Sequence, residues 1–193
     1  MDSLFNHDSY LIKRQVVALT GKVRLYSPDG ELALYVEQKM FRLKEDIRAY
    51  ADESRTREIL YIQARQILDF SAAYDIYDST LGSKVGVLRR KGWSSLMQDK
   101  WEVMDANDQL IGILQEDNLT RALLRRMLLG ALLPQDYDLL IGEERAADLK
   151  QRFHLFRYEM DLDFSMDTRH LLDRRIGVAA GILLAVVEGR QDR

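Results

Sequence analysis

The sequence predicts a mainly β fold, a closed antiparallel barrel of about ten to twelve strands around a buried C-terminal helix. Three observations predict it. Short segments that alternate apolar and polar residues recur along the chain, joined by polar turns that contain Asp or Gly. Each hairpin formed in this way has a single apolar face, so the sheet must close on itself or pack against another element. Residues 176–187, IGVAAGILLAVV, are apolar on every side and supply that element.

The composition is that of one globular domain covering residues 1–193. Hydrophobic residues make up 47% of the chain and charged residues 31%, with a net charge of −3. Cysteine is absent, which excludes disulfides and thiolate metal sites. The first residues, MDSLFNHDSY, lack the apolar core of a secretory signal, so we expect a cytoplasmic protein. The negative net charge predicts no general attraction to nucleic acid or to anionic membranes.

The expected strands follow one another as hairpins. An N-terminal strand is predicted at residues 10–14, YLIKR, and the turn SPDG at residues 27–30 is a strong hairpin signal. Four hairpins share this pattern of two alternating segments and a polar turn: 23–26 with 32–36, 47–51 with 59–64, 74–78 with 85–88, and 101–105 with 110–114. Residues 137–141 with the more polar 145–153 predict a weaker fifth hairpin, and residues 156–164 a last strand.

Residues 176–187 are predicted to form the buried helix. A dozen helical residues span about 18 Å, well short of the roughly 30 Å of hydrocarbon in a bilayer, so a transmembrane role is disfavoured. Gly177, Ala179, Ala180 and Gly181 leave almost no side chain on part of the helix surface. We therefore expect the backbone of the barrel wall to approach the helix closely there.

Two further features flank the predicted barrel. Arg174 and Arg175 precede the apolar helix, and we expect them to pair with Asp173 or with another carboxylate at the mouth of the barrel. A second, amphipathic helix is predicted over residues 119–129, where leucines recur at helical spacing and Gly130 ends the pattern. We expect this second helix to lie as a lid across one end or side of the barrel.

The order and spacing of these segments resemble a known family. The chain is similar to the LURP-one-related and phospholipid scramblase-like proteins in the succession of YLIKR, YSPDGELALYVEQK, ILYIQARQILDFSAAYDIYD, VGVLRRKG and WEVMDANDQLIGILQE, followed by a last strand and a hydrophobic helix. The resemblance implies the tubby C-terminal-like fold, a closed barrel of about twelve strands threaded by its last helix. For function, it implies calcium and phospholipid movement, as in scramblase-like proteins, or phosphoinositide binding, as in tubby domains.

The resemblance also places an acidic calcium-binding segment just before the C-terminal helix. In this chain Asp161, Asp163, Ser165 and Asp167 alternate there, as oxygen ligands do at the opening of a calcium loop. Asp161, Asp163 and Asp167 are therefore the candidate metal ligands, and calcium is the candidate cofactor.

A structural interpretation of the same segment competes with the calcium site. The rest of a calcium loop is missing, since Met166 stands where a turn-forming glycine is needed and Leu172 replaces the closing glutamate. Alternation would place the carboxylates on the outer face of a strand, about 6.6 Å apart, whereas calcium binds oxygen at about 2.3 to 2.6 Å. In this interpretation Asp167 or Thr168 caps the following helix.

Two basic clusters are candidates for binding an anionic lipid headgroup. The candidate residues are Arg89, Arg90, Lys91, Trp93, Arg125 and Arg126. The first four lie at a hairpin tip, where an aromatic ring beside three cations suits an anionic surface and each cation contributes about 1 kcal/mol. The last two lie on the predicted lid helix. The alternative for both clusters is an ordinary solvated surface.

No catalytic pattern is present in the sequence. The chain has no phosphate-binding glycine loop, no nucleophile-elbow serine and no paired histidines, so we expect no enzymatic activity. Two functional hypotheses remain. The favoured one is a non-catalytic cytoplasmic binding module for an anionic phospholipid headgroup or a protein partner. The alternative is a calcium-responsive, membrane-active protein of the scramblase-like type.

Overall fold

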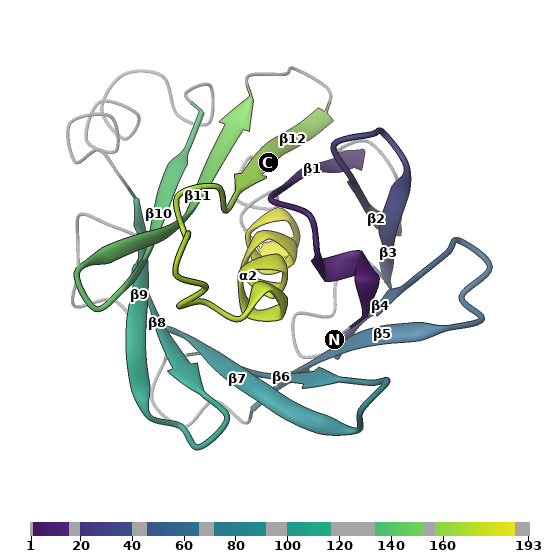
Figure 1. The fold of residues 1–193 in the computed structure, drawn as a ribbon. Helices are drawn as coiled ribbons and strands as arrows, with labels where there is room; N and C mark the ends of the chain where they lie inside the picture. The colour runs from purple at the N-terminus through teal and green to yellow at the C-terminus, as the bar shows by residue number, and fades with distance from the viewer. Residues whose placement is uncertain are drawn as a thin grey trace.

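The fold is a closed barrel with a helix inside it (Figure 1). A computed structural model describes residues 2–15, 20–39, 46–65, 72–91, 100–116, 134–152 and 157–187. These residues form twelve antiparallel strands, and helix α2 (Arg174–Val187) runs through the centre of the barrel. The predicted fold class is therefore confirmed. The predicted lid helix at 119–129 lies outside the described residues.

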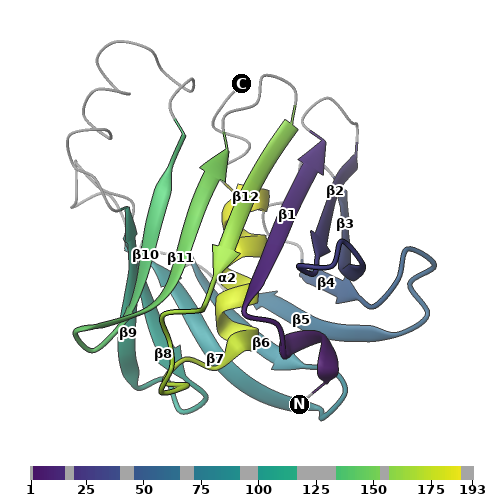
Figure 2. The same cartoon turned by 45° about the horizontal axis from the view of Figure 1, so that its top comes forward.

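The strands follow the chain around the barrel. They are β1 (Ser9–Gln15), β2 (Thr20–Tyr26), β3 (Leu32–Lys39), β4 (Ile47–Tyr50), β5 (Glu58–Ala64), β6 (Ala73–Asp78), β7 (Ser83–Arg90), β8 (Lys100–Asp105), β9 (Leu110–Glu116), β10 (Asp136–Ile141), β11 (Glu144–Arg152) and β12 (Arg157–Asp163). Each strand pairs with its neighbours in the sequence, and β1 closes the barrel by pairing with β12 (Figure 2). A short 3₁₀ helix, η1 (Ser3–Phe5), precedes β1.

All five predicted hairpins and the two terminal strands are present. The fifth hairpin, β10 with β11, gave the weakest sequence signal because β11 carries many charges. Its inward-facing Ala147 and Leu149 are nevertheless completely buried. The charged residues Lys150 and Arg152 lie on the outside of the barrel, where water solvates them.

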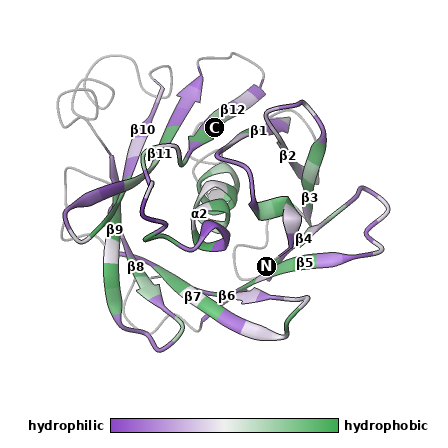
Figure 3. Cartoon of the chain, viewed as in Figure 1, coloured by the Kyte–Doolittle hydropathy of each residue, from purple (hydrophilic) through white to green (hydrophobic). Residues whose placement is uncertain are grey.

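Helix α2 fills the barrel, and Arg174 and Arg175 form its start ahead of the predicted apolar run 176–187. The side chain of Asp173 accepts a hydrogen bond from the Arg175 amide (3.0 Å) and caps the helix. Beyond its hydrophilic first turn the helix is largely hydrophobic (Figure 3). None of the helices in the described residues has both the length and the apolar character needed to span a membrane.

The predicted helix caps, Asp167 or Thr168, are wrong. Asp167 instead accepts hydrogen bonds from the amides of Leu171 (2.8 Å) and Leu172 (3.0 Å). It therefore stabilises the turn before the helix, while Asp173 serves as the cap itself.

The small residues of α2 allow close approach at two positions. A Cβ atom at Gly177 would lie 2.4 Å from Cε1 of Phe164, and one at Gly181 would lie 2.4 Å from Cδ1 of Ile12. Both distances are far below van der Waals contact. Side chains, from the segment after β12 at Gly177 and from β1 at Gly181, and not the backbone of the barrel as expected, occupy the space that these glycines leave.

One inward-facing position of β1 carries a charge. Arg14, only 5% exposed, donates a hydrogen bond from Nη1 to the carbonyl oxygen of Ala185 near the end of α2 (2.6 Å). A cation at a helix C-terminus is stabilised by the carbonyl groups that lack a partner in the helix and by the helix dipole. This contact holds the last turn of α2 against β1.

Candidate functional site

The interior of the barrel is filled by side chains. Inward-facing residues such as Ile12, Val103 and Leu162 are completely buried and belong to one core with α2. Two grooves lined by described residues open at the molecular surface instead. One lies over β1 and β12, and the other lies between η1 and the segment that leads into α2. A binding site formed by described residues is therefore expected on the outside of the barrel.

The basic cluster at the end of β7 is held by a buried carboxylate. Arg89 faces Glu102 across the β7–β8 ladder, and its Nε lies 2.7 Å from Oε2 of that residue. Nζ of Lys91 lies 2.8 Å from Oε1 of the same carboxylate. Arg90 packs over the ring of Trp101 at 5.9 Å. Two of the three cations predicted at this hairpin tip thus share one acidic partner. The other predicted residues, Trp93, Arg125 and Arg126, lie outside the described residues.

Glu102 gives this cluster a pH dependence that can be measured. Burial raises the pKa of the Glu102 carboxyl, but the hydrogen bonds from Lys91 and Arg89 outweigh burial, so the pKa is lowered overall. A carboxyl with a lowered pKa in the folded state stabilises the fold at pH values above its unfolded-state pKa. That contribution is lost as the pH falls through the folded-state pKa.

We therefore expect Glu102→Gln to lower the free energy of unfolding by about 1 kcal/mol at pH 7, because the cations that Glu102 binds are half-exposed. The difference in the free energy of unfolding between this variant and the natural protein should shrink below about pH 4. Urea unfolding at pH 7 and at pH 3 measures both effects. A difference of the same size at the two pH values would contradict the assignment to this carboxylate.

The predicted calcium ligands have separate partners. Asp161 accepts two hydrogen bonds from Arg152, each 2.7 Å long. Asp163 accepts a hydrogen bond from the amide of Ser165 (2.8 Å), and Asp167 stabilises the turn before α2. No three acidic or histidine side chains in the described ranges are arranged to hold a metal ion. The structure therefore does not bring Asp161, Asp163 and Asp167 to a common point.

Ion pairs tie the start of α2 to the mouth of the barrel, as predicted. Arg175 lies 2.7 Å from Asp78 and 2.5 Å from Asp173, and Arg174 lies 3.1 Å from Asp8. Burial raises the pKa of the completely buried Asp78, but hydrogen bonds from the β6–β7 turn and from Arg175 outweigh burial and lower the pKa. These contacts hold the helix in place.

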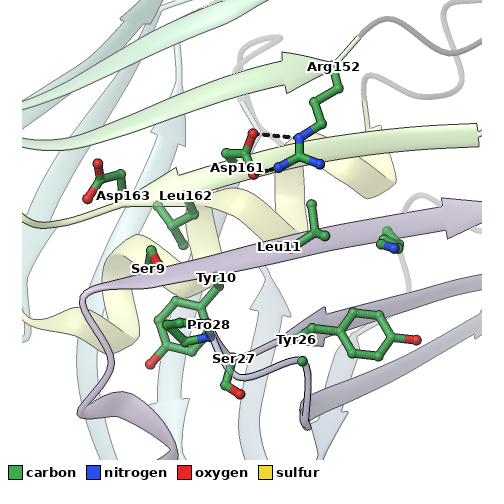
Figure 4. Close-up of a pocket in the computed structure, with 12 residues that line it drawn as sticks. Ser9, Tyr10, Leu11, Tyr26, Ser27, Pro28, Arg152, Asp161, Leu162 and Asp163 are labelled. Carbon is green, nitrogen blue, oxygen red and sulfur yellow. Dashed lines mark hydrogen bonds and ion pairs between the residues drawn. The ribbon is translucent and has the colours of Figure 1, made fainter.

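The groove over β1 and β12 is the candidate binding site (Figure 4). It has a volume of about 730 Å³ and lies on the outer face of the barrel, beside the β2–β3 turn. Leu11 lies in its middle, between Tyr26 and the ion pair of Arg152 with Asp161. Pro28 of the β2–β3 turn completes the apolar surface. The groove thus combines an apolar floor with charged walls.

The register of the strands explains this arrangement. Leu11 stands opposite Tyr26 of β2 on one side and opposite Asp161 of β12 on the other. Two residues further along β1, Lys13 stands opposite Glu159. Because successive side chains of a strand point to opposite faces, Leu11 and Lys13 share the outer face while Ile12 between them is buried.

Sequence reasoning missed this groove. It placed YLIKR on a strand but assigned no role to Leu11 or Lys13, since the strand that completes the groove, β12, comes from the other end of the fold. The signal that could have found it is an apolar residue at an outward position, which Leu11 and Tyr26 both provide.

A comparison with protein families supports the LURP-one-related part of the resemblance. No curated protein and no solved structure matched the chain. The model of the LURP-one-related family matches residues 32–175, which is more than half of the chain. The match runs from β3 to the start of α2 and includes β12, which forms one side of the groove. The chain therefore belongs to the LURP-one-related family.

Proposed function

We propose that this member of the LURP-one-related family is a non-catalytic cytoplasmic binding module that holds a segment of a protein partner in the groove over β1 and β12. The observation that carries the proposal is the composition of the groove. Leu11, Tyr26 and Pro28 provide an apolar surface that contains an aromatic ring, and charges of both signs surround it. Protein interfaces combine an apolar, aromatic centre with a polar rim in the same way.

The charges around the groove favour a protein over an anionic lipid headgroup. Of the two described cations that line the groove, Arg152 binds Asp161, and Lys13, which lies 4.0 Å from Glu159, is partly compensated. The cations at the end of β7 also share a carboxylate. Attraction to an anionic membrane depends on several uncompensated cations on one surface. A partner that brings both signs of charge suits this groove better.

The first test changes the centre of the groove. Leu11→Arg places a charge on the apolar floor, so capture of the partner should fall at least about tenfold, as when an interface anchor is lost. Ile113→Arg is the matched control, because Ile113 is a partly buried residue of β9 on another part of the barrel wall. Affinity capture with quantitative mass spectrometry compares the two variants with the natural protein.

The proposal requires a partner that the natural protein and Ile113→Arg capture equally and that Leu11→Arg loses. Equal capture by all three proteins would contradict it. Circular dichroism spectra of the variants establish that each is folded before capture is compared.

Vesicle flotation tests the lipid alternative. We expect equally low recovery of the natural protein with vesicles of phosphatidylcholine alone and with vesicles that also contain phosphatidylserine. Glu102→Gln removes the carboxylate that binds Arg89 and Lys91, so this variant should be recovered better with the anionic vesicles. Strong recovery of the natural protein with anionic vesicles alone would favour headgroup binding and contradict the proposed protein partner.

A further inference from the structure

The two ends of the groove carry opposite charges that the fold leaves partly unsatisfied. At one end, Nζ of Lys13 lies 4.0 Å from Glu159, which is beyond hydrogen-bond distance, and 5.5 Å from the centre of the Tyr26 ring. At the other end, Asp163 accepts an amide hydrogen bond from Ser165 and forms no ion pair with any described residue. Both side chains line the groove and can bind an incoming charge.

Strand geometry sets the distance between these two ends. Asp163 stands opposite Ser9 in the β1–β12 ladder, and Lys13 lies four residues further along β1. At about 3.4 Å per residue, the two charged positions are roughly 14 Å apart along the strands, with Leu11 halfway between them. Any extended chain has the same rise and the same alternation. Its residues i, i+2 and i+4 therefore match the spacing of Asp163, Leu11 and Lys13.

We propose that the groove binds an extended protein segment in which a basic and an acidic residue stand four positions apart, with an apolar residue midway. This inference rests on the proposed function and names the chemistry of the partner. The basic residue pairs with Asp163, the acidic residue pairs with Lys13, and the apolar side chain packs against Leu11 and Tyr26. The three contacts together use the whole length of the groove.

Other ligands fit this spacing less well. In an α-helix, residues four apart are separated by only about 6 Å along the axis, which is less than half of the distance between Asp163 and Lys13. A zwitterionic lipid headgroup carries its two charges on adjacent groups and reaches only one end. Because the described strands form a closed barrel, no strand edge is free to pair with the backbone of the segment. Recognition therefore depends on side chains. The segment can run parallel or antiparallel to β1, provided that its basic residue lies at Asp163 and its acidic residue at Lys13.

Three synthetic peptides with blocked termini test the proposal. Their central sequences are Lys-Thr-Leu-Thr-Glu (peptide KE), Lys-Thr-Leu-Thr-Lys (peptide KK) and Glu-Thr-Leu-Thr-Glu (peptide EE). Nuclear magnetic resonance titration of the isotope-labelled full-length chain measures each affinity and locates the bound surface. The natural protein should bind peptide KE at least about fivefold more tightly than the other two, because only KE offers an opposite charge at both ends.

Reversing one charge of the groove should change which peptide is preferred. Lys13→Glu makes both ends acidic and should prefer peptide KK, whereas Asp163→Lys makes both ends basic and should prefer peptide EE. All of these preferences should weaken as salt is added, because the groove is open to solvent.

Matched controls separate this effect from a change in net charge. Arg48→Glu on β4 and Glu143→Lys in the β10–β11 turn alter the net charge equally at exposed positions outside the groove, and both should keep the preference for peptide KE. Asp163→Asn keeps an oxygen that can accept the Ser165 amide but removes the charge, so it should bind peptides KE and EE equally. This milder variant provides the test if Asp163→Lys does not fold.

The inference is wrong if the natural protein shows no preference for peptide KE, or if the charge-reversed variants keep that preference. Such a result would leave the proposed function to be judged by Leu11→Arg in the capture experiment. Loss of capture by Leu11→Arg together with indifference to the peptides would mean that the groove binds a partner of different chemistry. Correct peptide preferences together with unaltered capture would mean that the captured partner binds elsewhere.

Discussion

Gly112→Val is expected to lower the free energy of unfolding by at least about 3 kcal/mol, the upper end of the usual range for an overpacked interior. Gly112 is buried in β9, where it pairs with Val103 of β8 and with Ile141 of β10. A Cβ atom at this position would lie 2.1 Å from the carbonyl oxygen of Leu140 in β10. Because that oxygen belongs to the backbone, it cannot rotate away, and β10 would have to move off β9.

The matched control for this experiment lies in the same strand. Leu110 is 60% exposed, so Leu110→Val should change the free energy of unfolding by less than about 0.5 kcal/mol. Urea unfolding followed by circular dichroism measures both variants. If Gly112→Val were as stable as the natural protein, the close approach of β9 and β10 described above would be incorrect.

Gly177→Val is expected to destabilise the fold by about 3 kcal/mol, because the new side chain would enter the space of Phe164. A Cβ atom would lie 2.4 Å from Cε1 and 2.6 Å from Cζ of that completely buried ring. The ring is also fixed from another side, since the guanidinium of Arg174 packs over it at 4.4 Å. Removing a glycine from a helix interior gains up to about 1 kcal/mol of helix propensity, which is too little to offset the clash.

A pair of alanine variants isolates the steric part of this effect. Gly177→Ala and Gly181→Ala make the same substitution in the same helix, so their gains in helix propensity are equal. At Gly181 the new Cβ would meet the terminal methyl of Ile12, which can turn to another rotamer, whereas the Phe164 ring cannot. Gly177→Ala should therefore unfold at a lower urea concentration than Gly181→Ala. The reverse order would show that the ring has room to move.

Much of the fold could be predicted because its strongest patterns are local. The β2–β3 hairpin is visible in the sequence since its alternating strands and its SPDG turn are adjacent. Helix α2 is visible because a run that is apolar on all sides has to be buried. The start of the helix was harder to predict, since Asp167, Thr168 and Asp173 are all suitable caps by residue type. Only the path of the chain shows that Asp173 is the cap.

The candidate site could be predicted only in part, because cross-strand register decides which charges meet. The sequence identified Arg89 and Lys91, but it did not show that Glu102 stands opposite Arg89 on the next strand. It also identified Asp161 as an acidic residue of an outer strand face, but not its partner Arg152. A shift of one residue in the β7–β8 ladder would remove the Arg89–Glu102 pair, and the same shift in the β11–β12 ladder would remove the Arg152–Asp161 pair.

Because β1 pairs with β12, and α2 follows β12, a growing chain cannot complete the fold until residue 187 has left the ribosome. Until then, the hairpins that are synthesised earlier have exposed apolar faces and unpaired outer strands. Both features promote the aggregation of nascent polypeptides. Helix α2, which follows all twelve strands in the sequence, supplies the interior of the barrel that they form. The topology therefore leaves the nascent chain open to aggregation until β12 and α2 have been made.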